Sequence, residues 1–359
     1  MNLSQDYWSI NKENVDPINE DVSVLDLFSG AGFASAGLKK MFNVSLALDS
    51  NIDCCKSYKE NHSQTTVVNR KVEDFNVVKK DADLLFYHPT FKYSSAAKHH
   101  LLFGSPPCKE FSRQNKKRDL AAGKLLFSEF LRICKEMQPD FVVMENVVAV
   151  PRDIKQWVVK ELEKLSFKVT SQIIDAAEFG SIQARRRWLT IGSKHKHIAL
   201  EKVTTLKSSR EVLTNQPSKM SISKEILDLV KDIKVIGKWT NLPGRIRDNY
   251  YIVDPSRAFP TIVHPLKSRY FKILIRKDDQ LIPLQSLDQL KKLDFPLKQE
   301  NVEVSLLTMQ ELLAAFDVEN YRLHGTLSSQ AQQIANAFPA AMAYSISKSI
   351  HNSIQDTVA

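Results

Sequence analysis

The sequence predicts an α/β fold with a doubly wound, mostly parallel sheet, joined to a second, smaller and irregular domain. From residue 21 to about residue 195, short apolar runs alternate with helix-like stretches. Runs that are apolar on both faces and separated by helices are typical of buried parallel strands in βαβ units. The rhythm then fades into a stretch rich in Lys and Pro, and a chain of 359 residues is long enough for two domains.

The expected strands of the sheet occupy residues 22–27, 45–49, 140–145, 167–174 and 188–191. A Leu-Leu-Phe triplet occurs twice, at residues 84–86 and 101–103. Either copy could form the strand that leads into the loop at Gly104.

One helix is expected over residues 125–134, where Phe127, Phe130, Leu131 and Cys134 recur at helical spacing. This spacing places Cys134 in the core. Beyond residue 195, strand-like pieces are expected at 250–253 and 270–275, and a final helix near 332–350.

The composition is that of an ordinary globular protein, with 43% hydrophobic and 25% charged residues. It argues against disordered, collagen-like and disulfide-scaffold classes. No run approaches the ~20 apolar residues that cross a bilayer, and the polar N-terminus is not expected to be a secretory signal. Four cysteines favour a reducing, intracellular compartment. The net charge of +9 permits a nucleic-acid partner.

Three carboxylates, Asp26, Asp49 and Glu145, stand at the carboxyl ends of expected strands. Ligands bind at this edge of open parallel sheets. The first strand is followed by a glycine turn, FSGAG at residues 28–32, and Asp49 comes about 20 residues later, where dinucleotide-type folds place the acid that binds ribose hydroxyls. The arrangement favours nucleoside binding over a plain tight turn.

The segment GSPPCKEFS at residues 104–112 contains the strongest chemical signal. Two prolines stiffen the backbone directly before Cys108, which excludes a helix interior. Polar and basic neighbours could stabilise a thiolate there, so Cys108 is predicted to be a nucleophile rather than an inert loop cysteine.

Glu145 ends the most apolar strand of the chain, where a carboxylate is costly to desolvate unless it is paired or protonated. It is a candidate acid catalyst or a salt-bridged residue. In QARRR at 183–187, an extended backbone would put Gln183, Arg185 and Arg187 on one face. That row suits phosphate or carbonyl recognition, and a solvated basic run is the alternative.

Histidines 88, 99 and 100 lie near one another in the sequence, but they lack the usual spacing of metal ligands. No metal site is expected from them.

Taken in order, these motifs resemble the DNA (cytosine-5)-methyltransferase family. The resemblance spans residue 22 to about residue 350 and rests on five blocks: DLFSGAG at 26–32, PPC with FS at 106–112, ENV at 145–147, QxRxR at 183–187 and QIANAFP at 333–339.

The resemblance implies a Rossmann-like methyltransferase fold and a role for each residue. Cys108 would attack C6 of a cytosine, Glu145 would hold N3 and donate a proton, and Arg187 with Arg185 would contact O2 of the base. S-adenosylmethionine would be the cofactor. The residues expected around it are Phe28, Gly30, Gly32, Asp49, Asp74, Pro107 and Asn336.

The same resemblance implies four segments: a mobile leader at 1–20, a catalytic and cofactor-binding domain at 21–195, a target-recognition domain at 196–327, and a C-terminal helix at 328–359 that returns to the catalytic domain. The expected partner is double-stranded DNA with a flipped-out cytosine. We expect a monomer with no membrane partner, in the nucleus of a eukaryote or the cytoplasm of a bacterium or virus.

Several positions depart from the family pattern. Phe33 and Ala335 stand where glycine is usual, Lys109 replaces a usual glutamine, and Ser305 lies where an arginine often opens the penultimate motif. The acid expected near Val72 is displaced to positions that include Asp74, and the insertion at 87–100 is atypical.

Two alternatives remain open. One is the same chemistry on RNA, although the Cys-Phe-Thr tripeptide of the tRNA branch is not found. The other is a catalytically weakened nucleic-acid binder, which the departures favour and the retained Cys108, Glu145 and Arg187 oppose.

Overall fold

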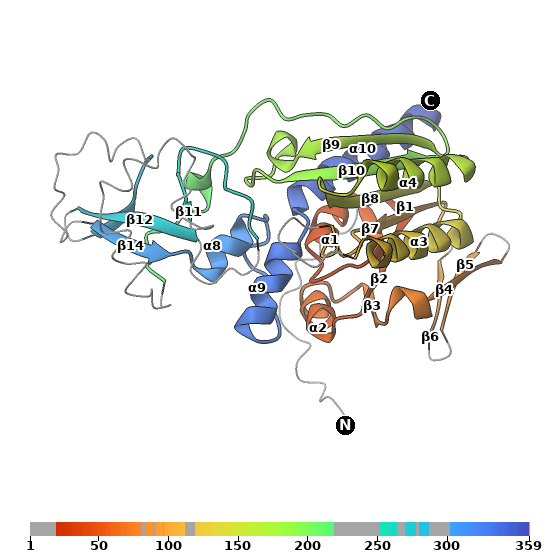
Figure 1. The fold of residues 1–359 in the computed structure, drawn as a ribbon, viewed down its shortest axis with the longest axis horizontal. Coiled ribbons are helices and arrows are strands. Elements are labelled where there is room, and N and C mark those ends of the chain that lie inside the picture. Colours follow the sequence, from red (N-terminus) through yellow and green to blue (C-terminus); the bar gives the residue numbers. More distant parts are fainter. Residues whose placement is uncertain are drawn as a thin grey trace, which may run out of the picture.

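The computed structural model describes residues 19–80, 83–88, 91–95, 97–111, 119–218, 251–263, 270–277, 280–286 and 302–358. Most of the expected leader, Ser112 and much of the expected recognition domain therefore lie outside the described residues. Figure 1 shows a large α/β part on the right and a smaller part on the left, with a helix near the C-terminus running between them.

The large part is built on a seven-stranded sheet, in the order β3-β2-β1-β7-β8-β10-β9. The strands from β3 to β8 run parallel, whereas β10 is antiparallel to both of its neighbours. This confirms the predicted mostly parallel sheet. The bounds are β1 Asn19–Leu27, β2 Phe42–Asp49, β3 Thr66–Asn69, β7 His99–Gly104, β8 Phe141–Val147, β9 Lys168–Asp175 and β10 Arg186–Ser193.

The expectation that residues 167–174 and 188–191 form buried parallel strands is wrong in part. Residues 188–191 are buried in β10, but this strand runs antiparallel to both neighbours. Residues 168–174 lie in β9, which keeps the direction of β8 but forms the sheet edge, with several exposed side chains. The short connection between β9 and β10, which contains the 3-10 turn Ala176–Phe179, carries no crossover helix of the kind that a parallel pair needs.

Helices cover both faces of the sheet (Figure 1). On one face, α3 and α4 pack through residues such as Phe130 and Val158, and on the other, α1 and α10 pack through Leu38 and Ile346. Cys134 lies in the first of these cores and is 1% exposed, as predicted. The helices are α1 Phe33–Leu38, α2 Ile52–Asn61, α3 Leu120–Met137, α4 Arg152–Lys164 and α10 Ala340–Val358.

The single final helix expected near 332–350 is instead two helices, α9 (Leu327–Asn336) and α10. The break falls at Pro339, whose ring cannot continue a helix interior. It turns the chain so that α10 packs on α1 and the sheet, while α9 extends toward the small part (Figure 1).

The repeated Leu-Leu-Phe triplet is resolved in favour of its second copy, which lies in β7 and leads to Gly104. The first copy lies in β5 (Asp83–His88). That strand pairs antiparallel with β4 (Asn76–Lys80) and β6 (Phe91–Ser95) in a separate sheet at the margin of the large part (Figure 1).

The small part contains β11 (Tyr251–Ile252), β12 (Tyr270–Lys277), β13 (Gln280–Pro283), β14 (Val302–Leu306) and α8 (Met309–Ala314). It shares a third apolar core with the glycine turn and α9 of the large part, to which Phe33, Phe259, Phe316 and Ile334 contribute. The two parts are therefore joined by a common core. Among the described residues, no helix has the length and apolar character needed to span a membrane.

Candidate active site

The predicted functional residues gather at the carboxyl edge of the sheet. Asp49 is the last residue of β2, Glu145 lies near the end of β8, and Cys108 is in the loop after β7. Because β2, β1, β7 and β8 are successive neighbours, their loops open on the same edge.

The Cys108 loop is held from both sides. The Asn146 side chain donates a hydrogen bond of 2.8 Å to the Pro106 carbonyl. The Phe111 amide donates to the Cys108 carbonyl at 3.0 Å, and the Phe111 ring stacks on Phe127 at 5.2 Å. The sequence indicated a stiff loop, but the anchoring role of Asn146 was missed, although it follows Glu145 directly.

The charges around the Cys108 thiol oppose one another. Burial raises its pKa, the charge of Arg187 lowers it, that of Glu145 raises it, and Arg185 lowers it. The net effect is a raised pKa, so the resting group is a thiol and the arginines limit the cost of making the thiolate.

Glu145 and Arg187 form an ion pair, with Nε 2.7 Å from Oε1. Their side chains are 9% and 12% exposed. The pairing of β10 with β8 brings them together, because it sets Arg187 opposite Val147 and Leu189 opposite Glu145. The antiparallel direction of this strand, which the sequence did not predict, thus delivers the arginine to the acid.

Arg185 is buried, and its guanidinium donates to the carbonyls of Ile262 at 3.0 Å and Ala335 at 2.9 Å. Burial lowers its pKa to about 9. Gln183 is also buried while Arg186 is exposed, in keeping with the shared face expected from the sequence. The contacts of Arg185 favour a positioning role between the small part and α9 over direct contact with a base.

Asp49 is tied to the glycine turn, since its carboxylate accepts from the Gly30 amide at 2.9 Å and the Asn51 amide at 2.8 Å. Burial raises the pKa of Asp49, and these hydrogen bonds lower it in part. A Cβ added at Gly30 would meet nothing within 4 Å, whereas one at Gly32 would lie 2.6 Å from the His62 ring. The turn therefore presents open space at Gly30 and packed protein at Gly32.

The other predicted cofactor residues lie at the surface or in part-buried positions. Phe28 is part-buried with φ 55°, and Pro107, Asn336 and Asp74 are exposed, with Asp74 in the 3-10 turn Val72–Asp74. Their roles stay predictions.

Asp26 differs from the other two strand-end acids because its side chain faces the interior. It accepts from the Ser35 hydroxyl at 2.6 Å, and Ser35 in turn accepts from the Tyr58 hydroxyl at 2.6 Å. Burial raises the pKa of Asp26 to about 7.

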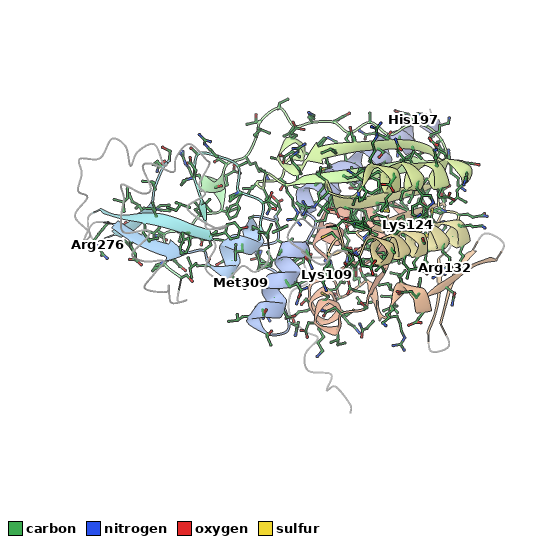
Figure 2. All side chains as sticks on the ribbon, in the orientation of Figure 1. Lys109, Lys124, Arg132, His197, Arg276 and Met309 are labelled. Carbon is green, nitrogen blue, oxygen red and sulfur yellow. The ribbon has the colours of Figure 1, made fainter. Side chains whose placement is uncertain are left out.

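The departures from the family pattern do not crowd the site. Phe33 is 2% exposed and packs edge-on against Phe316 and Tyr321, with centroids 5.5 and 5.3 Å away. Ala335 is buried, and Lys109 is exposed near the middle of the molecule (Figure 2).

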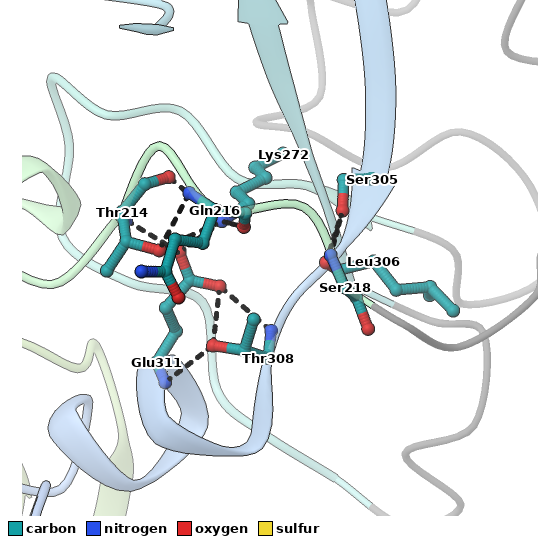
Figure 3. A network of polar contacts seen from close by, with 8 residues as sticks. All are labelled: Thr214, Gln216, Ser218, Lys272, Ser305, Leu306, Thr308 and Glu311. Carbon is teal, nitrogen blue, oxygen red and sulfur yellow. Dashed lines mark hydrogen bonds and ion pairs between the residues drawn. The ribbon is translucent and has the colours of Figure 1, made fainter. Parts of the chain in front are cut away.

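Ser305 stands where the family often has an arginine, and a lysine on the neighbouring strand supplies a positive charge nearby. Lys272 lies opposite Ser305 in the β12–β14 pairing, and its ammonium is 2.6 Å from the Glu311 carboxylate (Figure 3). The same ammonium donates to the Thr214 and Gln216 carbonyls at 2.9 and 2.6 Å. Sequence reasoning missed Lys272, because no linear signal relates it to Glu311.

The chain is similar to known proteins. The family model described as C-5 cytosine-specific DNA methylase matches residues 22–352. The Type II methyltransferase M1.HphI of Haemophilus parahaemolyticus is 30% identical over 181 residues, which is 48% of this chain and 46% of the relative. The Type II methyltransferase M.HgiDI of Herpetosiphon aurantiacus is 24% identical over 336 residues, 92% of this chain and 94% of the relative.

Two solved structures share the fold. The S. pombe Dnmt2 methyltransferase has a TM-score of 0.60 and 16% identity, covering 92% of this chain and 98% of that one. The Entamoeba histolytica methyltransferase EhMeth has a TM-score of 0.60 and 14% identity, covering 94% and 99%. The match spans about half the length of the first curated relatives, 46% and 47% of two of them.

Proposed function

Because the chain belongs to the C-5 cytosine-specific DNA methylase family, we propose that it methylates C5 of a cytosine in double-stranded DNA. The observation that carries the proposal is the meeting of Cys108, Glu145 and Arg187 at the carboxyl edge of the sheet, on three separate segments of the chain. A nucleophile, an acid and a forked donor at one place suit addition to a pyrimidine ring.

In the proposed mechanism, the Cys108 thiol passes its proton to the neighbouring Glu145 carboxylate, directly or through water, and the thiolate adds to C6 of the base, so that C5 becomes nucleophilic. Arg187 and Arg185 favour this step because their charges lower the cost of the thiolate. After C5 is methylated, a base removes the C5 proton, Cys108 leaves as a thiolate and the N3 proton returns to Glu145, which restores the double bond.

Glu145 would hold the ring at N3 and pass to it the proton received from Cys108 as the adduct forms. Its ion pair with Arg187 orients the carboxylate, and an entering base would take the place of part of this contact. Arg187 would then contact O2 of the base.

The glycine turn fits the proposed cofactor, S-adenosylmethionine. The open space at Gly30 allows close approach to the backbone, and Asp49 is held where it can accept from ribose hydroxyls. When bound, this cofactor supplies an electrophilic methyl group.

The target base must leave the duplex stack to reach Cys108. The net charge of +9 supports binding to phosphates, and the small part is the proposed recognition domain of a monomer. We expect affinity for DNA to fall steeply with salt, measured by fluorescence anisotropy at several salt concentrations.

The central test incubates the protein with labelled S-adenosylmethionine and either duplex DNA or tRNA. We expect label at C5 of cytosine in DNA. Label in tRNA alone would contradict the proposed substrate and favour the RNA alternative.

Cys108→Ser distinguishes an enzyme from a binder. The variant should keep DNA affinity and lose transfer by about 10³-fold or more, because the nucleophile is gone. Wild type should form a covalent complex with 5-fluorocytosine DNA, visible on a denaturing gel. A folded, cofactor-bound wild type that forms no such complex would favour the weakened binder.

Two glycine variants test the cofactor site. Gly30→Ala should reduce cofactor affinity by calorimetry at a folding cost of about 1–2 kcal/mol, since Gly30 has a left-handed φ of +55° but its Cβ meets open space. Gly32→Ala should instead destabilise the fold, because its Cβ would collide with His62 and Tyr58. Equal cofactor affinity in wild type and Gly30→Ala would place the cofactor elsewhere.

A further inference from the structure

A second cluster of chemically versatile side chains lies at the edge of the sheet opposite Cys108. His99 begins β7, Asp140 directly precedes β8, and His195 follows the end of β10. These strands are successive neighbours, and β10 runs antiparallel, so its end lies beside the other two starts. The three residues come from distant parts of the sequence, which is why spacing alone gave no sign of them.

The ligand atoms of the cluster are close together. One nitrogen of each histidine and one carboxylate oxygen of Asp140 lie within 4.8 Å of one another. His99 Nδ1 is 3.8 Å from Asp140 Oδ2, and the two imidazole centroids are 6.2 Å apart. Two imidazoles and a carboxylate are a ligand set that zinc uses with a water in the fourth position.

The carboxylate is oriented by the backbone. Asp140 Oδ2 accepts from the His100 amide at 2.8 Å, and the Asp140 amide donates to the His100 carbonyl at 2.9 Å. The Lys194 amide donates to the Asp140 carbonyl at 3.0 Å. These contacts join the three strand ends around Asp140 and fix the ligand beforehand.

His99 supplies an independent indication of a ligand. Its Nδ1 is buried and has no hydrogen-bond partner, and it faces Asp140 beyond hydrogen-bond distance. A buried unpaired polar atom is costly, and a metal ion bound to it removes that cost.

The neighbouring lysines direct their charges to other groups. Lys98 pairs with Asp21 at 2.9 Å, Lys196 pairs with Asp356 at 2.7 Å, and Lys168 donates to the His195 carbonyl at 2.6 Å. Lys194 lies over the Phe167 ring at 5.5 Å. The charges of Lys98 and Lys196 are balanced by carboxylates, which lowers the repulsion that a cation at the cluster would meet.

We propose that His99, Asp140 and His195 bind a divalent transition-metal ion of the zinc class, which joins the ends of β7, β8 and β10. Because the cluster lies at the far edge from Cys108, the ion has a structural role and takes no part in methyl transfer. This inference does not depend on the proposed function.

The test titrates Zn²⁺ into the metal-free full-length protein by calorimetry and follows the thermal unfolding midpoint. We expect one equivalent to bind and the midpoint to rise, because a ligand that binds only the folded state stabilises it. His195→Ala should weaken binding by about tenfold or more and abolish the rise. Co²⁺ in place of Zn²⁺ should give visible absorption bands that the variant lacks.

His197→Ala is the matched control, because His197 is an exposed histidine outside the cluster (Figure 2). It should bind like wild type. Asp140→Asn is the second variant, since its amide oxygen can still accept from His100 while the ligand charge is lost.

No saturable binding, or equal binding by wild type and His195→Ala, would overturn the proposal and leave a metal-free histidine–carboxylate contact. Binding that survives His195→Ala but is lost in Cys108→Ser would assign the metal to the thiols instead. The midpoints of the metal-free variants show whether each is folded.

Discussion

Two buried carboxylate–cation pairs of the protein differ in how many further hydrogen bonds they make. They are Glu145–Arg187 in the large part and Glu311–Lys272 in the small part. Lys272 and Glu311 are 1% and 0% exposed. Glu311 accepts from Lys272, from Thr214, and from the amide and hydroxyl of Thr308 (Figure 3). Arg187 and Glu145 meet through one contact of 2.7 Å and remain partly exposed.

The difference agrees with a structural role for Glu311–Lys272 and with the reactive role that we propose for Glu145–Arg187. A buried ion pair holds its geometry when further hydrogen bonds satisfy the remaining polar atoms. Glu311 meets that condition and joins β12, α8 and the segment at 214–216. Glu145, at the sheet edge, has fewer hydrogen-bond partners among the described residues. Its carboxylate can therefore still accept a further partner, as the proposed acid must.

The largest expected effect comes from breaking the reactive pair. Glu145→Gln should lower methyl transfer by about 10²–10⁴-fold, because a positioned proton donor is lost. Its unfolding midpoint should change less than in Lys272→Met, since the glutamine oxygen can still accept a hydrogen bond from Arg187. Single-turnover assays measure the rate, and Glu161→Gln, from the exposed pair with Lys164, is the control. Unchanged transfer would remove Glu145 from the mechanism.

The next effect should come from Lys272→Met in the saturated pair. Leaving Glu311 buried and unpaired should cost about 3–5 kcal/mol of the free energy of unfolding. Urea denaturation measures it, with Lys164→Met as the exposed control. Replacing both partners, Lys272→Met with Glu311→Leu, should restore part of the loss. A Lys272→Met cost no larger than the control would show that the network is not stabilising.

A third buried carboxylate, Asp26, has a neutral hydroxyl partner instead of a cation. The pKa of Asp26 rises from 3.8 to about 7 on burial. Between these values the folded state holds a proton that the unfolded state lacks, so stability is lost as pH rises through this window, by up to about 4 kcal/mol.

Asp26→Asn should remove that loss. Urea unfolding of wild type and variant at pH 5 and pH 7.5 measures the difference between them. Parallel curves for the two proteins would mean that Asp26 does not titrate in this range.

The smallest effect concerns the thiols. Burial raises the pKa of Cys108, but the charge of Arg187 opposes this shift. In contrast, burial raises the pKa values of Cys55 and Cys134 to about 12. Iodoacetamide should therefore label Cys108 before those two, faster as pH rises, and Arg187→Gln should slow the labelling a few-fold. Peptide mass spectrometry reads the sites. Labelling at Cys134 first would contradict this order.

Much of the fold could be predicted from the sequence, because the signals are local. Apolar runs located β1, β2 and β8, and helical spacing placed Cys134 in the core. The direction of β10 could not be read, since a short apolar run looks the same in a parallel and an antiparallel strand. Pro339 marks the break between α9 and α10 in the sequence, but the expected helix continued through it because the helical apolar pattern is present on both sides.

For the site, residue type and motif order single out Cys108, Glu145 and Arg187 as candidates, because few residue types can perform each proposed chemical role. The sequence could not show which other groups these residues contact. Asn146 on the Pro106 carbonyl, Arg185 on Ile262 and Ala335, and Lys272 in place of a charge at 305 are all contacts across many residues.

By itself, the sequence determined which groups are available and where the chain forms strands, helices and turns, since these follow from side-chain chemistry and short-range periodicity. Only the tertiary structure decided which groups meet. Strand direction and packing bring Arg187 to Glu145 and His195 to His99, and turn Asp26 inward while Asp49 meets the glycine turn. Distances between residues far apart in the chain depend on the whole fold, so no local pattern encodes them.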